Sequence, residues 1–131
     1  MRADGRELAA IFAGGAAGAG LRTGIVEAAG SRAGHWPWVT FAVNVAGCLL
    51  LGYLATRLQE RLPITAYRRP LLGTGLCGGL TTFSTAQIEL LQMLDRGAPG
   101  LAAGYLSASV AAGFLGVLLG TAAVRRARLT W

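Results

Sequence analysis

Gly78-Gly79-Leu80-Thr81-Thr82-Phe83-Ser84-Thr85 lies in the middle of an apolar run from about residue 70 to 94. Paired glycines followed by hydroxyl-bearing and β-branched residues are poor helix formers. We therefore expect a helix over 70–94 that is broken near the bilayer midplane, where freed backbone groups must be buried in protein or line a cavity. A glycine kink with hydroxyls bonded back to the helix is the alternative. Four hydroxyls in five residues are hard to explain by a kink alone.

Three further apolar runs are long enough to cross a membrane, which requires about 20 residues of helix. The chain is 53% hydrophobic and 14% charged, whereas soluble domains carry about 25% charge. The 131 residues are therefore expected to form one all-α, four-helix transmembrane domain, 1–131. Its expected spans are about 8–29, 36–56, 70–94 and 99–124, separated by residues 31–34, 57–69 and 95–97.

The twelve basic residues are all arginines, and alternating crossings would divide them unequally between the two sides. One side would hold Arg32 and Arg96, and Arg22 lies within the first run. Because positively charged loops stay in the cytoplasm, we expect a multi-pass protein of the cell (plasma) membrane with both termini cytoplasmic. The nine arginines on the cytoplasmic side would be Arg2, Arg6, Arg57, Arg61, Arg68, Arg69, Arg125, Arg126 and Arg128.

The first run combines small residues with a charge. Gly14 and Gly18, like Gly20 and Gly24, are spaced for close contact with another helix. Packing does not explain Arg22, because a charge at membrane depth costs at least about 2.5 kcal/mol. We expect Arg22 to reach the interface, to pair or to line a wet cavity, in a vestibule or structural role near an anion path.

The second and fourth runs each carry polar residues that need partners in lipid. Asn44 lies one turn after Thr40 on the same helix face. Asn44 fits either an interhelical hydrogen bond or a donor to a dehydrated anion. In the fourth run, Tyr105 and Ser109 are one turn apart and extend the polar positions along a possible path.

Little in the sequence indicates an enzyme, a metal cluster or a disulfide. Cys48 and Cys77 both lie inside apolar runs, and His35 is the only histidine. The cysteines are interpreted as small buried hydrophobes. No nucleophile–base pair is recognisable, and the glycine-rich runs are not followed by the lysine of a phosphate-binding loop.

Three motifs together resemble those of the CrcB/Fluc family of fluoride channels. The resemblance covers nearly the whole chain, in both the number and the order of spans. It implies a fluoride-selective channel that exports fluoride across the plasma membrane, lowers cytoplasmic fluoride and acts in an antiparallel dimer with two anion pores. The motifs are Gly14-Gly15-x-x-Gly18-x-x-x-Arg22, Asn44 followed by Gly47, and Gly78-Gly79-Leu80-Thr81-Thr82-Phe83-Ser84-Thr85.

The resemblance also implies where ions bind. A central Na⁺, structural or activating, would be held by backbone carbonyls at the break of the third helix. By motif position these carbonyls belong to Gly78 and Thr81. The pore asparagine of the family falls on Asn44, and its first pore phenylalanine falls on Phe83.

The remaining pore residues implied by the resemblance form a polar track. It would include Ser84 or Thr85, together with Tyr105 and Ser109. The chemistry suits fluoride, a small and strongly hydrated ion whose lost water must be replaced by amide and hydroxyl donors lining a narrow pore. The edge of a phenyl ring carries positive potential, so Phe83 can face an anion edge-on.

The chain departs from the family pattern at Ala86, where a second phenylalanine is usual. A homodimer would lack that ring in both pores. The unequal arginines also argue against insertion in both orientations. We therefore expect a fixed orientation and a dimer that is possibly a heterodimer with an oppositely oriented homologue, although a homodimer that tolerates Ala86 remains the alternative.

Two other functions are alternatives to a conducting fluoride channel. A small multidrug-type transporter would need a membrane-embedded carboxylate, but Glu27 and Glu89 lie toward the ends of their runs. A non-conducting subunit that stabilises a heterodimeric channel is compatible with the missing phenylalanine. Nucleic acid is not expected as a partner, because the arginines lie at the ends of apolar runs.

Overall fold

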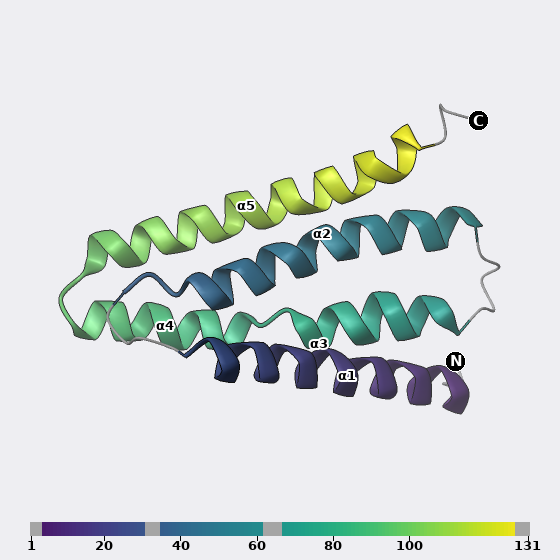
Figure 1. Cartoon of the computed structure of the whole chain (residues 1–131), viewed down its shortest axis with the longest axis horizontal. Helices are drawn as coiled ribbons and strands as arrows, with labels where there is room; N and C mark the ends of the chain where they lie inside the picture. The colour runs from purple at the N-terminus through teal and green to yellow at the C-terminus, as the bar shows by residue number, and fades with distance from the viewer. Residues whose placement is uncertain (1–3, 31–34, 62–66, 128–131) are drawn as a thin grey trace.

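The computed structural model describes residues 4–30, 35–61 and 67–127, which are helical apart from short connections (Figure 1). The longest helices are α1 (Gly5–Ala29), α2 (Trp38–Arg61) and α5 (Pro99–Arg126). All three are long and apolar enough to cross a membrane. The predicted all-α class and a multi-pass membrane protein are therefore confirmed.

Three shorter elements lie between α2 and α5. They are the π-helix η1 (Pro70–Cys77), α3 (Gly78–Leu80) and α4 (Phe83–Asp95). None of them alone reaches the length of a membrane-spanning helix. The residues of the third expected crossing, 70–94, are thus divided among three elements.

The chain leaves the helical conformation for two residues between α3 and α4. Thr81 has φ −78° and ψ 146°, and Thr82 has φ −138° and ψ 114°. Both conformations are extended, so the helical hydrogen bonds cannot continue across them. The interruption falls at the first two hydroxyl-bearing residues after the paired glycines.

Along the long axis of the molecule, α1, α2, the series of η1, α3 and α4, and then α5 run in alternating directions (Figure 1). The start of α1 and the end of α5 consequently lie at the same end. The most extensive contacts join α2 to α5 and α1 to η1, and α4 contacts α5 less extensively. Both elements that flank the interruption, α3 and α4, also contact α2, so the interruption lies beside α2.

Glycines allow α1 to approach the segment before the interruption closely. A Cβ added at Gly14 would meet the carbonyl oxygen of Leu71, and one added at Gly18 would meet that of Leu76. The expected packing role of this pair is therefore seen. The second predicted pair differs: a Cβ at Gly20 or Gly24 would meet nothing within 4 Å among the described residues.

The glycines of the fourth run face α2. A Cβ at Gly116 would lie 3.2 Å from the carbonyl oxygen of Val45, and one at Gly120 would meet that of Leu49. These glycines thus pack between α2 and α5. Close backbone contact of this kind lets membrane helices associate through van der Waals packing.

A small apolar core lies where α4 meets α5. Its buried members are Met93, Ala102 and Tyr105. Ala86 is among the partly buried residues packed against this core, so its face of α4 is directed into the subunit. The other partly buried neighbours are Trp36, Phe41, Leu90 and Leu101.

Candidate functional site

Asn44 of α2 forms two hydrogen bonds with the backbone of the interruption. Its Nδ2 donates to the Thr82 carbonyl at 3.1 Å, and the Thr82 N–H donates to its Oδ1 at 2.8 Å. Thr82 is 7% exposed, and buried backbone groups without partners are costly. The side chain of Asn44 therefore replaces the helical hydrogen bonds that the interruption removes.

The two carbonyls predicted to hold Na⁺ both lose their helical donors. In a continuous helix, Thr82 N–H would donate to Gly78, and Thr85 N–H would donate to Thr81. Here Thr82 N–H binds Asn44, and Thr85 N–H binds the Thr82 hydroxyl at 3.1 Å. Among the described residues the Gly78 and Thr81 carbonyls accept no other hydrogen bond. Freed carbonyls are the ligand type that broken membrane helices offer to Na⁺, so these residues fit that ion.

Hydroxyl groups cluster at the start of α4. The Thr82 hydroxyl donates to Thr85 Oγ1 at 2.9 Å and lies 3.4 Å from Ser84 Oγ. Arg22 Nη1 also donates to Thr85 Oγ1, at 3.4 Å. Thr85 Oγ1 thus accepts two bonds, and its own hydrogen has no acceptor among the described residues. That hydrogen is available to an anion.

Arg22 lies beside a cavity of about 240 Å³ between α1 and the start of α4. Its Nε is buried and has no hydrogen-bond partner among the described residues. Arg22 is therefore placed where it can attract an anion toward Thr85, and its vestibule role stays a prediction. The cavity is lined by Arg22, Thr23, Val26, Glu27, Thr82 and Thr85.

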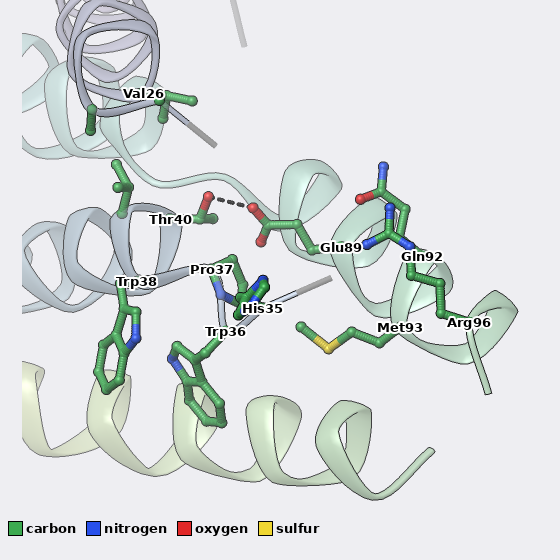
Figure 2. Close-up of a pocket in the computed structure, with 13 residues that line it drawn as sticks. Val26, His35, Trp36, Pro37, Trp38, Thr40, Glu89, Gln92, Met93 and Arg96 are labelled. Carbon is green, nitrogen blue, oxygen red and sulfur yellow. Dashed lines mark hydrogen bonds between the residues drawn. The ribbon is translucent and has the colours of Figure 1, made fainter. Parts of the chain in front are cut away.

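A second polar group centres on Glu89 of α4 (Figure 2). Thr40 Oγ1 donates to Glu89 Oε1 at 2.6 Å, and the Tyr105 hydroxyl donates to Oε2 at 2.8 Å. Thr40 and Tyr105 are buried. Each hydroxyl has a single hydrogen, so both are directed to the carboxylate rather than to a passing anion. Tyr105, predicted to line the polar track, is a donor to Glu89 in the subunit described here.

Glu89 is the residue of this site that the sequence analysis did not assign. Its position toward the end of the third run suggested a peripheral place, whereas it joins α2, α4 and α5. Thr40 was noted only as a neighbour of Asn44 on one helix face. The position of Thr40 could have indicated Glu89, because a second polar residue on that helix face needs a hydrogen-bond partner of its own.

Glu89 also borders a cavity of about 640 Å³. Figure 2 shows Gln92 and Arg96 on one side of Glu89, and Trp36 and Trp38 directed toward α5. The Trp36 ring packs edge-on against Tyr105, with the centroids 5.4 Å apart. The carboxylate thus lies at the boundary between the apolar core and an open, partly polar cavity.

The remaining predicted residues are placed separately. Ser109 Oγ is buried and has no hydrogen-bond partner among the described residues. Phe83 begins α4 directly after the interruption, and its side chain is 76% exposed. Ser84, the next residue, is exposed as well. One subunit therefore gathers Arg22, Asn44 and Thr85 near the interruption but leaves Phe83 without a covering surface.

Comparison with known proteins gives one consistent family. The model of CrcB-like protein, camphor resistance (CrcB), matches residues 9–121. "Fluoride-specific ion channel FluC 1" of Mycolicibacterium paratuberculosis is 58% identical over 126 residues, which cover 96% of each chain. FluC 2 of Nocardia farcinica is 45% identical, covering 90% of this chain and 84% of its own. FluC of Chloroflexus aurantiacus is 44% identical, covering 85% of this chain and 89% of its own.

The family match over residues 9–121 spans the positions of all three sequence motifs. The relatives are named as ion channels and not as enzymes. The resemblance stated from the motifs is therefore confirmed, and the chain belongs to the CrcB family.

Proposed function

We propose that this chain is a subunit of a fluoride-selective channel that exports fluoride across the plasma membrane and so lowers cytoplasmic fluoride. The relatives that it matches carry the name fluoride-specific ion channel. The observation that carries the proposal is the interruption at Thr81–Thr82, which Asn44 holds in place. A stabilised break frees hydrogen-bonding groups inside an otherwise apolar helix bundle.

The elements η1, α3 and α4 together serve as the third crossing in this proposal. They extend from Pro70 to Asp95 and run opposite to α2 and α5 (Figure 1). A third crossing broken near the bilayer midplane brings the Thr82–Thr85 hydroxyls to the depth where fluoride has lost most of its water. The whole chain, 1–131, is then a single transmembrane domain.

Both termini lie in the cytoplasm in this proposal. The starts of α1 and η1 and the ends of α2 and α5 share one end of the molecule (Figure 1). Seven described arginines belong to that end, and Arg96 belongs to the other. Positive residues are retained in the cytoplasm, which supports one fixed orientation. The seven are Arg6, Arg57, Arg61, Arg68, Arg69, Arg125 and Arg126; Arg2, Arg32 and Arg128 of the sequence count lie outside the described residues.

Fluoride would be bound by neutral donors rather than by a full positive charge. Thr85 offers a hydroxyl hydrogen, and Asn44 Nδ2 has a second hydrogen beyond the one donated to Thr82. Phe83 adds the positive edge of its ring. Several such groups lower the cost of removing water from fluoride while leaving the ion able to depart.

Phe83 supports a dimer, because a pore ring must face the path and its ring is 76% exposed in one subunit. An antiparallel partner would cover this side of α4. In that arrangement the Gly78 and Thr81 carbonyls would hold a central Na⁺, which would supply positive charge between the two subunits. Ser109, whose hydroxyl is buried without a hydrogen-bond partner among the described residues, remains a candidate for the polar track.

The partner is proposed to be a distinct homologue of opposite orientation. Ala86 packs against the internal core of Met93, Ala102 and Tyr105 and brings no ring to the path. The partner would then supply the second ring to at least one pore. The same observation favours one alternative, a non-conducting subunit that only stabilises the channel. The family assignment leaves the small multidrug-type transporter without support.

Fluoride efflux from liposomes tests the proposal. The purified chain is reconstituted alone and together with a homologue whose arginines are distributed in the opposite sense. Efflux that requires both chains and is lost with Asn44→Ala in this chain supports a conducting heterodimer. Robust efflux from this chain alone overturns the heterodimer, and efflux unaffected by Asn44→Ala or Phe83→Ala supports the non-conducting alternative.

A further inference from the structure

Gln87 is an exposed amide in the middle of α4 that no motif assigns. It is exposed, and within the described residues its side chain has no hydrogen-bond partner. It lies between the hydroxyl cluster and Glu89, neither of which it joins. Its two N–H donors and its carbonyl are all unused.

An unbonded amide is not suited to a surface that faces lipid. Transfer of an amide to an apolar environment is unfavourable unless a hydrogen bond replaces its water. The exposed face of α4 also carries Ser84, while Ile88 is 54% and Leu91 59% exposed. This mixed face therefore requires protein, or a path for hydrated ions, against it.

The spacing of Gln87 relates it to Phe83. Residues four apart lie on the same side of a helix, and both side chains are exposed. Ala86, where the family usually has its second ring, is partly buried against the core and carries only a methyl group. The exposed group one turn beyond Phe83 is thus an amide.

We propose that Gln87 takes part in fluoride selection. Its N–H groups would donate hydrogen bonds to fluoride at the next binding position along the ion path after the edge of the Phe83 ring. This inference rests on the proposed channel function and on a partner subunit covering the exposed face of α4. Like a ring edge, an amide N–H presents a neutral, positively polarised group to the ion, and it adds a directed hydrogen bond. In this subunit Gln87 therefore compensates for the ring that Ala86 lacks.

The test compares three variants at neighbouring exposed positions of the full chain. Gln87→Met keeps the length of the side chain and removes its donors, and Gln87→Asn keeps an amide. Ile88→Met is the matched control on the same exposed face. Each variant is co-reconstituted with the oppositely oriented homologue, and fluoride efflux, chloride efflux and dimer content are measured.

We expect Gln87→Met to lower fluoride efflux about tenfold or more, since a hydrogen bond to an ion is lost. Gln87→Asn should retain more of the rate, and Ile88→Met should match the unmodified chain, all at equal dimer content. Gln87→Met at the unmodified rate would overturn the inference and leave the channel function intact. Equal losses in Gln87→Met and Gln87→Asn would overturn it as well, because a packing role does not distinguish the amide. If Gln87→Met does not assemble, the fluoride efflux of Gln87→Asn is compared with that of Ile88→Met at equal dimer content.

A failure of the proposed function is recognised separately. If the unmodified chain gives no fluoride efflux either alone or with the homologue, both the channel proposal and the role of Gln87 fall.

Discussion

Asn44 and Thr82 bind each other through two hydrogen bonds in opposite directions, at 3.1 and 2.8 Å. One amide side chain thus satisfies both a carbonyl and an N–H group of the interrupted segment. Leaving buried groups of this kind unpaired costs about 1–3 kcal/mol each. The geometry of the interruption therefore depends on a residue of another helix.

Replacing Asn44 should affect both stability and transport. We expect Asn44→Ala to lower the free energy of unfolding by about 2 kcal/mol or more and to reduce fluoride efflux about tenfold or more. Thermal unfolding in detergent and liposome efflux measure the two effects. Thr56→Val is the control, because it removes hydrogen bonds to Gly52 and Thr121 while leaving the interruption unchanged. Unchanged unfolding and efflux in Asn44→Ala would contradict the assigned role.

Thr40 and Tyr105 should be coupled through Glu89. Each hydroxyl donates to a different oxygen of the same carboxylate, so losing one donor changes the surroundings of the other. We expect Thr40→Val and Tyr105→Phe to be non-additive, with a coupling free energy of about 0.5–3 kcal/mol. A double-mutant cycle of unfolding free energies measures it. Additive effects would show that Glu89 does not link the two helices energetically.

Alanine substitutions in the two glycine pairs of α1 should have different effects on stability. A Cβ at Gly18 would meet the carbonyl oxygen of Leu76, whereas one at Gly24 would meet nothing within 4 Å among the described residues. We expect Gly18→Ala to destabilise the subunit by about 1–3 kcal/mol and Gly24→Ala to change its stability by less than about 0.5 kcal/mol. Unfolding in detergent provides the measurement. Equal effects of the two changes would rule out close contact at Gly18.

Sodium replacement should reveal the proposed ion between the subunits. The Gly78 and Thr81 carbonyls lack their helical donors, and their oxygens would coordinate a bound Na⁺. We expect fluoride efflux to fall when Na⁺ on both sides is replaced by N-methylglucamine and to recover when Na⁺ returns. Efflux that is indifferent to Na⁺ at every concentration would remove the ion from the proposal.

The sequence predicted most helix positions because apolar run length is a local property. The run expected over 36–56 corresponds to α2 (Trp38–Arg61), and the run over 99–124 corresponds to α5 (Pro99–Arg126). The π-helical form of Pro70–Cys77 was not anticipated. Apolar periodicity indicates that a segment is helical but does not distinguish hydrogen-bond registers that differ by one residue.

The site was predictable only where a motif identified it. Asn44 and Thr85 were recognised from their motifs, but the role of Glu89 depends on α2 and α5 bringing Thr40 and Tyr105 to one carboxylate. Contacts separated by 49 and 16 residues leave no local pattern. The spacing of Gly20 and Gly24 also failed to predict that neither has a close neighbour among the described residues. Spacing shows which residues share a helix face but does not show which element packs against that face.

The dependence of Thr82 on Asn44 also bears on how the protein is made. The two residues are 38 positions apart, so Asn44 leaves the ribosome before Thr82 does. If the segment over 70–95 crosses the membrane as proposed, a cell that synthesised the latter half of this protein without the first two helices would have to insert an unsatisfied peptide segment into lipid. Chains truncated or split in this way are expected to be removed by quality-control proteases rather than to accumulate.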